Sequence, residues 1–225
     1  MKYSGVFFDF DYTLGDSTPA ITTGFQQGFR AMGLPMPTEA QVRPTIGMTL
    51  MDAYTYLTGD SNPARREEFY HQFQITVGEE ATGEFARAMV DQTALFSGAR
   101  ELLTALHDRG VKVAIVSTKH GSTIRKIFDH QGLLHTADLI VGGSDVTRSK
   151  PDPEGLSFAL TRLGLTAEQV LFCGDTVIDA QTARNGGADF SAVLNGTTPA
   201  AAFDAWPHVH VAPDLNELGR WLGML

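Results

Sequence analysis

The stretch FFDFDYTLGDS, residues 7–17, runs an apolar segment directly into two aspartates that are two residues apart, Asp9 and Asp11. An apolar run that ends in carboxylates suggests a buried strand whose last residues leave the core. Taken alone, the pair could be an ordinary polar strand end. Its meaning therefore depends on which other residues the fold brings to the same place.

Composition limits the possible functions. The chain has 225 residues, 43% of them hydrophobic, and a formal net charge of -9. An acidic protein repels phosphate backbones and anionic lipid surfaces, so we expect no nucleic-acid or membrane partner. Cys173 is the only cysteine, which excludes an internal disulfide, and no leader or membrane-length apolar run is visible. These features favour a cytoplasmic protein and leave its oligomeric state open.

From about residue 95 the chain alternates short β-branched runs with helical segments. Near-continuous apolar strands separated by helices indicate a parallel sheet that is covered on both faces. We therefore predict an α/β fold with a doubly wound, Rossmann-like parallel sheet. The expected strands after the first one are residues 111–117, 139–143, 169–175, 190–196 and 208–212.

The interval between the first strand and residue 94 breaks this alternation, because it contains no convincing strand. Its apolar periodicity predicts helices instead. We expect an α/β core made of residues 1–16 and 94–225, with residues 17–93 inserted as an all-helical domain. The expected helices of this insertion are residues 19–31, 48–57, 63–77 and 80–90.

Polar residues gather where the predicted strands end. Ligands of such sheets bind beyond the carboxyl ends of the strands, so these residues should face one crevice. Two carboxylates about 4 Å apart repel by roughly 4 kcal/mol at an effective dielectric near 20. One lysine cannot neutralise several of them, and oxygen ligands without histidine or cysteine favour Mg²⁺. The residues concerned are Asp9, Asp11, Ser117, Thr118, Lys150, Asp175 and Asp179.

Four short segments in this order resemble the motifs of the haloacid dehalogenase (HAD) superfamily. They are DFDYTLGDS, VST, Lys150 with Pro151, and GDTVID, and they span nearly the whole chain. The insertion after the first motif is similar to the helical cap of the first type in that family. The 32 residues between Ser117 and Lys150 leave no room for the second type of cap.

The resemblance implies a role for each motif residue. Asp9 would be the nucleophile that forms an aspartyl-phosphate, and Asp11 would act as general acid and then as general base. Ser117 would hydrogen-bond the phosphoryl group, and Lys150 would neutralise its charge. Mg²⁺ would be held by the Asp9 carboxylate, the Asp11 carbonyl and Asp175, with Asp179 in direct contact or just behind.

Other residues are expected to contact the substrate. Phe10 lies in the first motif and Thr118 in the second. RPTIGMTL, residues 43–50, resembles the cap segment of phosphoglycolate-phosphatase-like enzymes, so Arg43 and Gly47 are the candidates in the cap.

The residues also bear on which reaction is catalysed. Family members that do not act on phosphate esters lack an aspartate at the position of Asp11, so its presence implies phosphate-ester chemistry. The β-phosphoglucomutase branch has a cap histidine where this chain has Ile21, which favours hydrolysis. The expected activity is Mg²⁺-dependent hydrolysis of a small phosphomonoester, such as phosphoglycolate or a sugar phosphate. A mutase-like phosphotransferase, a pyrophosphatase and a non-catalytic phosphate-binding protein are the alternatives.

Tyr12 departs from the family pattern, which usually has glycine at this position. A glycine adopts unusual backbone angles without steric cost. We predict that the turn here tolerates a side chain, that φ of Tyr12 is below zero, and that its ring packs beside Leu14 and away from the phosphate.

Overall fold

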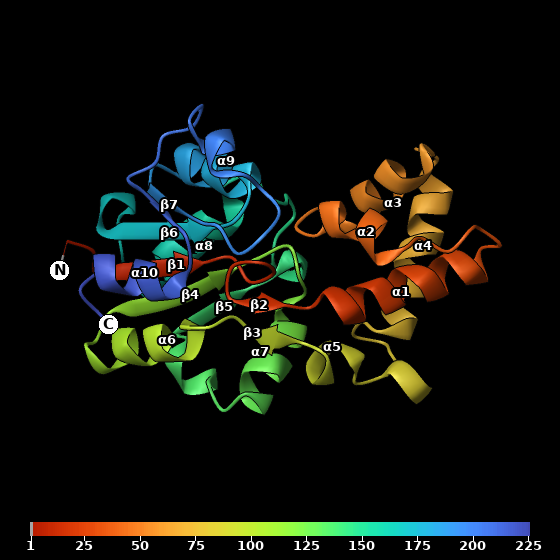
Figure 1. Cartoon of the computed structure of the whole chain (residues 1–225), viewed down its shortest axis with the longest axis horizontal. Coiled ribbons are helices and arrows are strands. Elements are labelled where there is room, and N and C mark those ends of the chain that lie inside the picture. Colours follow the sequence, from red (N-terminus) through yellow and green to blue (C-terminus); the bar gives the residue numbers. More distant parts are fainter. Residues whose placement is uncertain (1) are drawn as a thin grey trace. The chain divides into compact units, whose positions relative to one another are not determined.

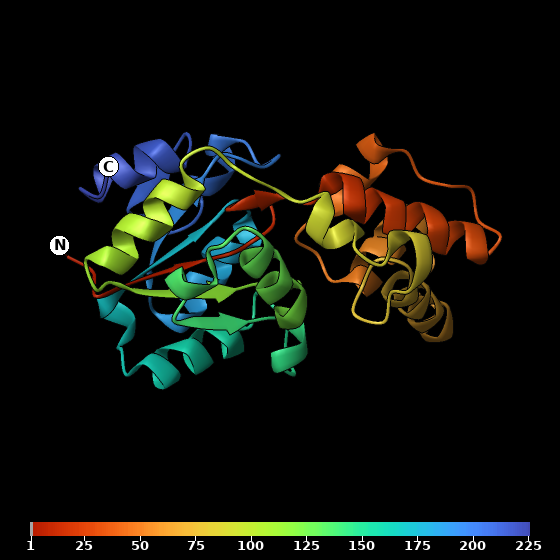
Figure 2. The same cartoon turned by 90° about the horizontal axis from the view of Figure 1, so that it is seen from below.

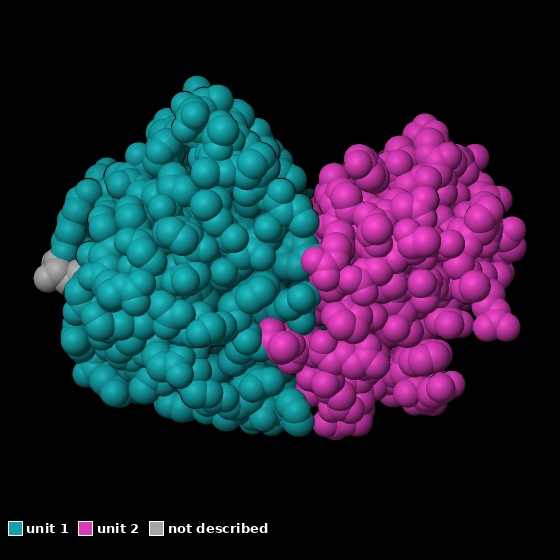
Figure 3. All heavy atoms as spheres, viewed as in Figure 1, with its two compact units in different colours: residues 1–16, 95–225 teal, residues 17–94 magenta. Residues whose placement is uncertain are grey.

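The computed structural model describes residues 2–225, and the chain folds into two compact units. Unit 1 consists of Met1–Asp16 and Leu95–Leu225, and unit 2 of Ser17–Ala94 (Figure 3). The chain passes between them through two short strands that pair with each other, β2 (Gly15–Asp16) and β3 (Ala94–Leu95). No described helix is long and apolar enough to cross a membrane.

Unit 1 is built on a six-stranded sheet in the order β5-β4-β1-β6-β7-β8, and every pairing in it is parallel (Figure 1). This confirms the predicted α/β fold with a doubly wound sheet. The expected strands are all present, somewhat shorter than predicted. They are β1 (Gly5–Phe8), β4 (Lys112–Val116), β5 (Leu139–Val141), β6 (Val170–Gly174), β7 (Asp189–Val193) and β8 (His210–Ala212).

Helices cover both faces of this sheet (Figure 2). α8 (Glu154–Leu163) and α9 (Val177–Gly186) pack together on one face, and α6 (Ala99–Asp108) and α10 (Leu215–Trp221) pack together on the other. α7 (Gly121–His130) lies beside β5. Because both faces are covered, the central strands are apolar throughout, as the sequence predicted.

The core beneath α8 and α9 shows how the strand sequence produces this packing. Phe7 of β1 and Phe172 of β6 are paired in register and are fully buried in the same cluster as Leu156 of α8. Burying each such side chain contributes about 1.5–3 kcal/mol. This packing holds the strand ends in place, and it therefore also fixes the positions of the residues that directly follow them.

Unit 2 is helical and has an aromatic core of its own. Phe69 of α4 is fully buried, and its ring centroid lies 5.0 Å from that of Phe25 and 5.4 Å from those of Phe29 and Tyr54. Phe25 and Phe29 lie one turn apart on α1, so they face α4 together. The helices of unit 2 are α1 (Thr18–Ala31), α2 (Glu39–Val42), α3 (Leu50–Thr58), α4 (Pro63–Thr76) and α5 (Ala88–Asp91).

One predicted helix of this unit is wrong. Residues 80–90 form only a 3-10 turn, Gly83–Phe85, followed by the four-residue helix α5. Gly83 has a φ of 77°, a left-handed conformation that interrupts a right-handed helix. By contrast, the helix expected after Asn62 is α4, where the Asn62 side chain accepts a hydrogen bond from the Ala64 amide at 2.9 Å.

Candidate active site

The sheet brings two aspartates together at its centre. Asp9 follows β1 directly, and Asp175 follows β6, the neighbouring strand. Phe8 pairs with Cys173, and the amide of Asp9 donates to the carbonyl of Cys173 at 2.9 Å. Both aspartates are only 2% exposed. Adjacent parallel strands thus place two buried acids at one edge of the sheet, as predicted.

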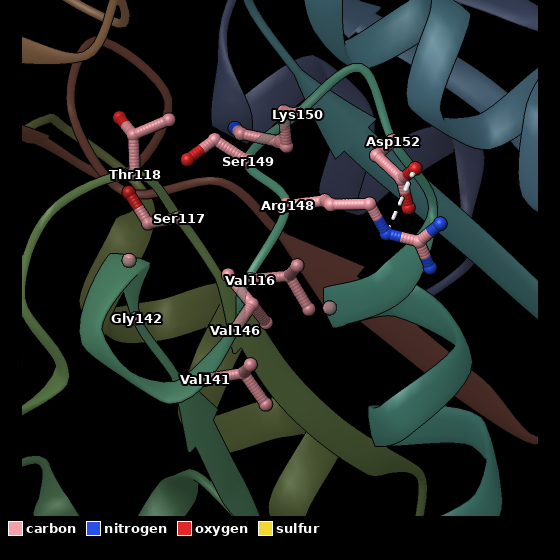
Figure 4. Close-up of a pocket in the computed structure, with 12 residues that line it drawn as sticks. Val116, Ser117, Thr118, Val141, Gly142, Val146, Arg148, Ser149, Lys150 and Asp152 are labelled. Carbon is pink, nitrogen blue, oxygen red and sulfur yellow. Dashed lines mark ion pairs between the residues drawn. The ribbon is translucent and has the colours of Figure 1, made fainter.

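Residues from β4 and from the loop after β5 lie at the same edge. Ser117 follows β4, and its amide donates to the carbonyl of Val141 at 3.0 Å. Ser117, Thr118, Ser149 and Lys150 line one pocket, in which the side chains of Ser149 and Lys150 lie near those of Ser117 and Thr118 (Figure 4).

Lys150 is the buried cation of this cluster. Its side chain is 6% exposed, and its Nζ lies 2.9 Å from Asp9 Oδ1 and 2.6 Å from Asp179 Oδ1. One lysine therefore bridges two carboxylates from different elements, one at the end of β1 and one in α9. Burial disfavours its charge, but Asp179 and Asp9 outweigh burial and raise the pKa of Lys150, so its charged form is favoured.

The acids respond to the same burial. Burial is the main cause that raises the pKa of Asp9 to about 6, with Lys150 partly opposing it and Asp179 adding to it. Burial, together with Asp179 and Asp9, also raises the pKa of Asp175 well above its usual range. Ionised carboxylates here need a further positive charge.

The donor set fits a divalent cation. One carboxylate oxygen each from Asp9, Asp175 and Asp179 lies within 4.8 Å of the others, and all three residues are buried. Asp9 Oδ1 is buried and, apart from its ion pair with Lys150, accepts no hydrogen bond among the described residues. A buried oxygen with unused acceptor capacity in an all-oxygen cluster suits a hard ion such as Mg²⁺.

Asp179 differs from the other two acids because both of its oxygens already have donors. Oδ1 pairs with Lys150, and Oδ2 accepts from the amide and the hydroxyl of Thr176, at 3.1 and 2.7 Å. Thr176 is the N-cap of α9, and Asp179 completes a capping box there. Asp179 therefore holds Lys150 in place and caps the start of α9.

Two glycines give the acids room. A Cβ on Gly174 would lie 2.6 Å from Asp179 Oδ2, and a Cβ on Gly196 would overlap Asp175 Oδ2. Gly174 belongs to the predicted fourth motif, but Gly196 had no signal in the sequence, because it lies in the loop after β7, far along the chain from Asp175. Its role appears only in three dimensions.

Asp11 lies apart from this cluster and has its own lysine. Both Asp11 oxygens accept from Lys119 Nζ, at 3.1 and 3.0 Å, and both side chains are less than 10% exposed. Sequence reasoning missed Lys119, although it stands two residues after Ser117. A second lysine means that four carboxylates face two cations, a net charge of -2 when all are ionised, which one divalent ion would balance.

Three of the expected substrate contacts have other surroundings. The Phe10 ring is fully buried and lies 6.1 Å from the Phe128 ring, so this side chain belongs to the core. Arg43 and Gly47 lie in unit 2, where the Arg43 guanidinium pairs with Glu39 at 2.9 Å and Gly47 has a φ of 99°. Their contact with substrate stays a prediction.

The prediction for the Tyr12 backbone is wrong, because its φ is 59°. The chain makes a tight turn here: the amides of Thr13, Leu14 and Gly15 all donate to the carbonyl of Phe10, and the Tyr12 amide donates back to Gly15. This turn requires the left-handed conformation that glycine usually supplies. Tyr12 adopts it with its side chain buried, at 3% exposure.

Buried carboxylates at the carboxyl ends of a parallel α/β sheet indicate a ligand-binding site, and the comparisons with known proteins identify the family. The family model described as "Haloacid dehalogenase-like hydrolase" matches residues 6–193. This chain belongs to that family, as its motifs predicted.

Several known proteins are similar to this chain over most of its length. A phosphoglycolate phosphatase of Vibrio cholerae serotype O1 is 30% identical over 188 residues, which cover 80% of this chain and 79% of that protein. A pyrophosphatase PpaX of Listeria monocytogenes serotype 4b is 29% identical, with 82% and 80% covered. A solved structure from Bacteroides fragilis, assigned to the haloacid dehalogenase-like hydrolases, is 36% identical with a TM-score of 0.88, and covers 96% of this chain and 100% of that chain.

Proposed function

We propose that this protein is a Mg²⁺-dependent phosphatase that hydrolyses a small phosphomonoester through an aspartyl-phosphate on Asp9. The observation that carries the proposal is the surroundings of Asp9: a buried carboxylate whose Oδ1 pairs with Lys150 at 2.9 Å and accepts no further hydrogen bond among the described residues. The relatives named phosphoglycolate phosphatase support the substrate class.

The proposed reaction has two steps, and each site residue has its own role in them. Asp9 attacks phosphorus, its new O–P bond forms as the ester P–O bond breaks, and Asp11 protonates the departing alkoxide. Water then attacks the phosphorus of the aspartyl-phosphate, Asp11 takes the proton of that water, and the bond to Asp9 breaks. Lys150 and the Ser117 hydroxyl hold the phosphoryl oxygens throughout. Asp9 and Asp175 would hold Mg²⁺, which supplies charge stabilisation for the transferred group.

The test is phosphate release from a panel of about a hundred phosphate esters, with Mg²⁺ and with EDTA. We expect turnover that requires Mg²⁺ and is lost in Asp9→Asn, a variant of nearly equal volume. Asp189→Asn is a matched control, because Asp189 pairs with Lys2 at the far end of β7. Absence of Mg²⁺-dependent turnover for every ester would refute the proposal.

Pyrophosphate hydrolysis is the second candidate, because the Listeria relatives are named pyrophosphatase PpaX. Including pyrophosphate in the same panel separates the two. We further propose that residues 17–93 act as a cap and that Arg43 and Gly47 help to select the substrate. Arg43→Ala should then raise KM for the preferred substrate, whereas Arg66→Ala, which removes another paired arginine of the same unit, should not.

A further inference from the structure

Lys119 and Asp11 form a closed ion pair beside the acidic cluster. Lys119 Nζ contacts both carboxylate oxygens, at 3.1 and 3.0 Å, and the two side chains are 8% and 9% exposed. A contact of one ammonium group to both oxygens fixes the direction in which the Asp11 side chain points. Lys150, the other buried lysine, serves Asp9 and Asp179 and leaves Asp11 to Lys119.

The backbone around Lys119 is held independently of this pair. The Lys119 amide donates to Ser117 Oγ at 3.3 Å, and its carbonyl accepts from the Gly143 amide at 3.0 Å. A Cβ on Gly142 would lie 2.5 Å from the Lys119 carbonyl oxygen, and one on Gly143 would overlap the carbonyl of Thr118. Gly142 and Gly143 thus pack directly against the loop that carries Lys119 and hold its backbone in place.

The Lys119 ammonium group also has a defined surface beneath it. Its Nζ lies 5.8 Å from the centre of the Phe10 ring, which is fully buried, so the side chain extends across a rigid aromatic face toward Asp11. Asp11, by contrast, stands in the tight turn after β1, outside the regular strand. The backbone of both partners is thus held by hydrogen bonds, and the ion pair sets where the Asp11 side chain points.

We propose that Lys119 is a positioning residue that sets the orientation of the Asp11 carboxylate for proton transfer. The inference rests on the proposed function, in which Asp11 protonates the leaving group and then activates water. A misplaced general acid matters most when the leaving group is a poor one, since an activated phenolate departs without a proton. The effect of losing Lys119 should therefore depend on the leaving group.

The test compares Lys119→Met, Lys119→Arg and the wild type on aryl and alkyl phosphates of graded leaving-group pKa. We expect Lys119→Met to lower kcat/KM for alkyl phosphates by about 10²-fold, within the range for general acid-base catalysis, and to affect dinitrophenyl phosphate far less. Lys119→Arg should recover part of the loss. Lys126→Met, which removes an exposed lysine of α7, is the charge-matched control and should show no such dependence.

A second measurement does not need turnover. Crystal structures of the wild type and of Lys119→Met should show the Asp11 carboxylate turned in the variant, with the loop of residues 117–121 unchanged. An unchanged Asp11 orientation would overturn the inference, as would an equal loss of kcat/KM for all esters. Failure of the proposed function is a separate result, because the wild type would then turn over no ester.

Discussion

Gly196 lies against the carboxylate of Asp175 so closely that a Cβ on Gly196 would overlap Asp175 Oδ2. The φ of Gly196 is outside the left-handed range, so its backbone accepts alanine and only crowding is at issue. Gly196→Ala should therefore displace Asp175 and weaken Mg²⁺ binding about 10–100-fold, the usual effect of disturbing the groups behind a metal ligand. Calorimetric titration with Mg²⁺ measures this. Thr197→Ala, a change at the exposed neighbour, should bind as the wild type does, and equal affinity in both variants would contradict the prediction.

Asp175 and Asp179 should respond differently to loss of their charge. Asp179 already accepts from Lys150 and Thr176, whereas the acceptor bond of Asp175 is a long one, 3.3 Å from Thr13 Oγ1. We expect Asp175→Asn to weaken Mg²⁺ binding more than Asp179→Asn. Asp179→Asn should mainly free Lys150, and so reduce turnover at saturating Mg²⁺. Titration of both variants with Mg²⁺ decides; a larger affinity loss in Asp179→Asn would show that it is the principal ligand.

The left-handed turn at Tyr12 gives a stability prediction in which two effects compete. Removing the buried ring costs about 3–5 kcal/mol, and relieving a left-handed non-glycine residue returns only about 1–2 kcal/mol. Both Tyr12→Gly and Tyr12→Ala should therefore be destabilised. Tyr12→Gly should be the more stable of the two by about 1 kcal/mol, because alanine keeps the strain.

Urea unfolding measures these free energies. Phe10 is the matched control, since it is equally buried but has no positive φ. There the order should reverse, with Phe10→Ala more stable than Phe10→Gly. If the glycine variant were the more stable one at both positions, backbone conformation would not be the cause of the difference at Tyr12.

Glu154 predicts a pH dependence of stability. Its carboxylate accepts from the amide of Thr147 at 2.9 Å, and also from the Thr147 hydroxyl and from Arg148, which lowers the pKa of Glu154 from 4.5 to about 2. A lowered pKa in the folded state stabilises the protein above the unfolded value, and this contribution disappears as the pH falls toward about 2. The melting temperature of Glu154→Gln should lie below that of the wild type at pH 7, by a gap that narrows as the pH falls from about 4.5 toward 2. Glu101→Gln, at an exposed site in α6, is the control; a gap that does not change with pH would contradict the prediction.

The strands themselves, and the positions of Asp9, Ser117, Lys150 and Asp175 after them, follow from patterns that are local in sequence. Each apolar run is bounded by turn residues, and each site residue comes just after such a run or in the loop that follows it. The failures have a different origin. Lys119 looks like any loop lysine until the turn after β1 brings Asp11 to it, and Gly196 matters only because β7 lies beside β6. Tyr12 breaks a local rule at the site itself, where surrounding hydrogen bonds impose a conformation that its residue type disfavours.

The separate aromatic core of unit 2 bears on how such a protein can change over evolutionary time. The rings of this core contact one another within residues 17–94; they are Phe25, Phe29, Tyr54 and Phe69. The carboxylates and lysines described above as the site all belong to the other unit. Residues 17–94 can therefore diverge, or be exchanged as a cassette, while the phosphate chemistry is inherited unaltered. Chimaeras of this chain could carry residues 17–94 from relatives named phosphoglycolate phosphatase or pyrophosphatase PpaX. Such chimaeras would use the segment as an interchangeable module in directed evolution.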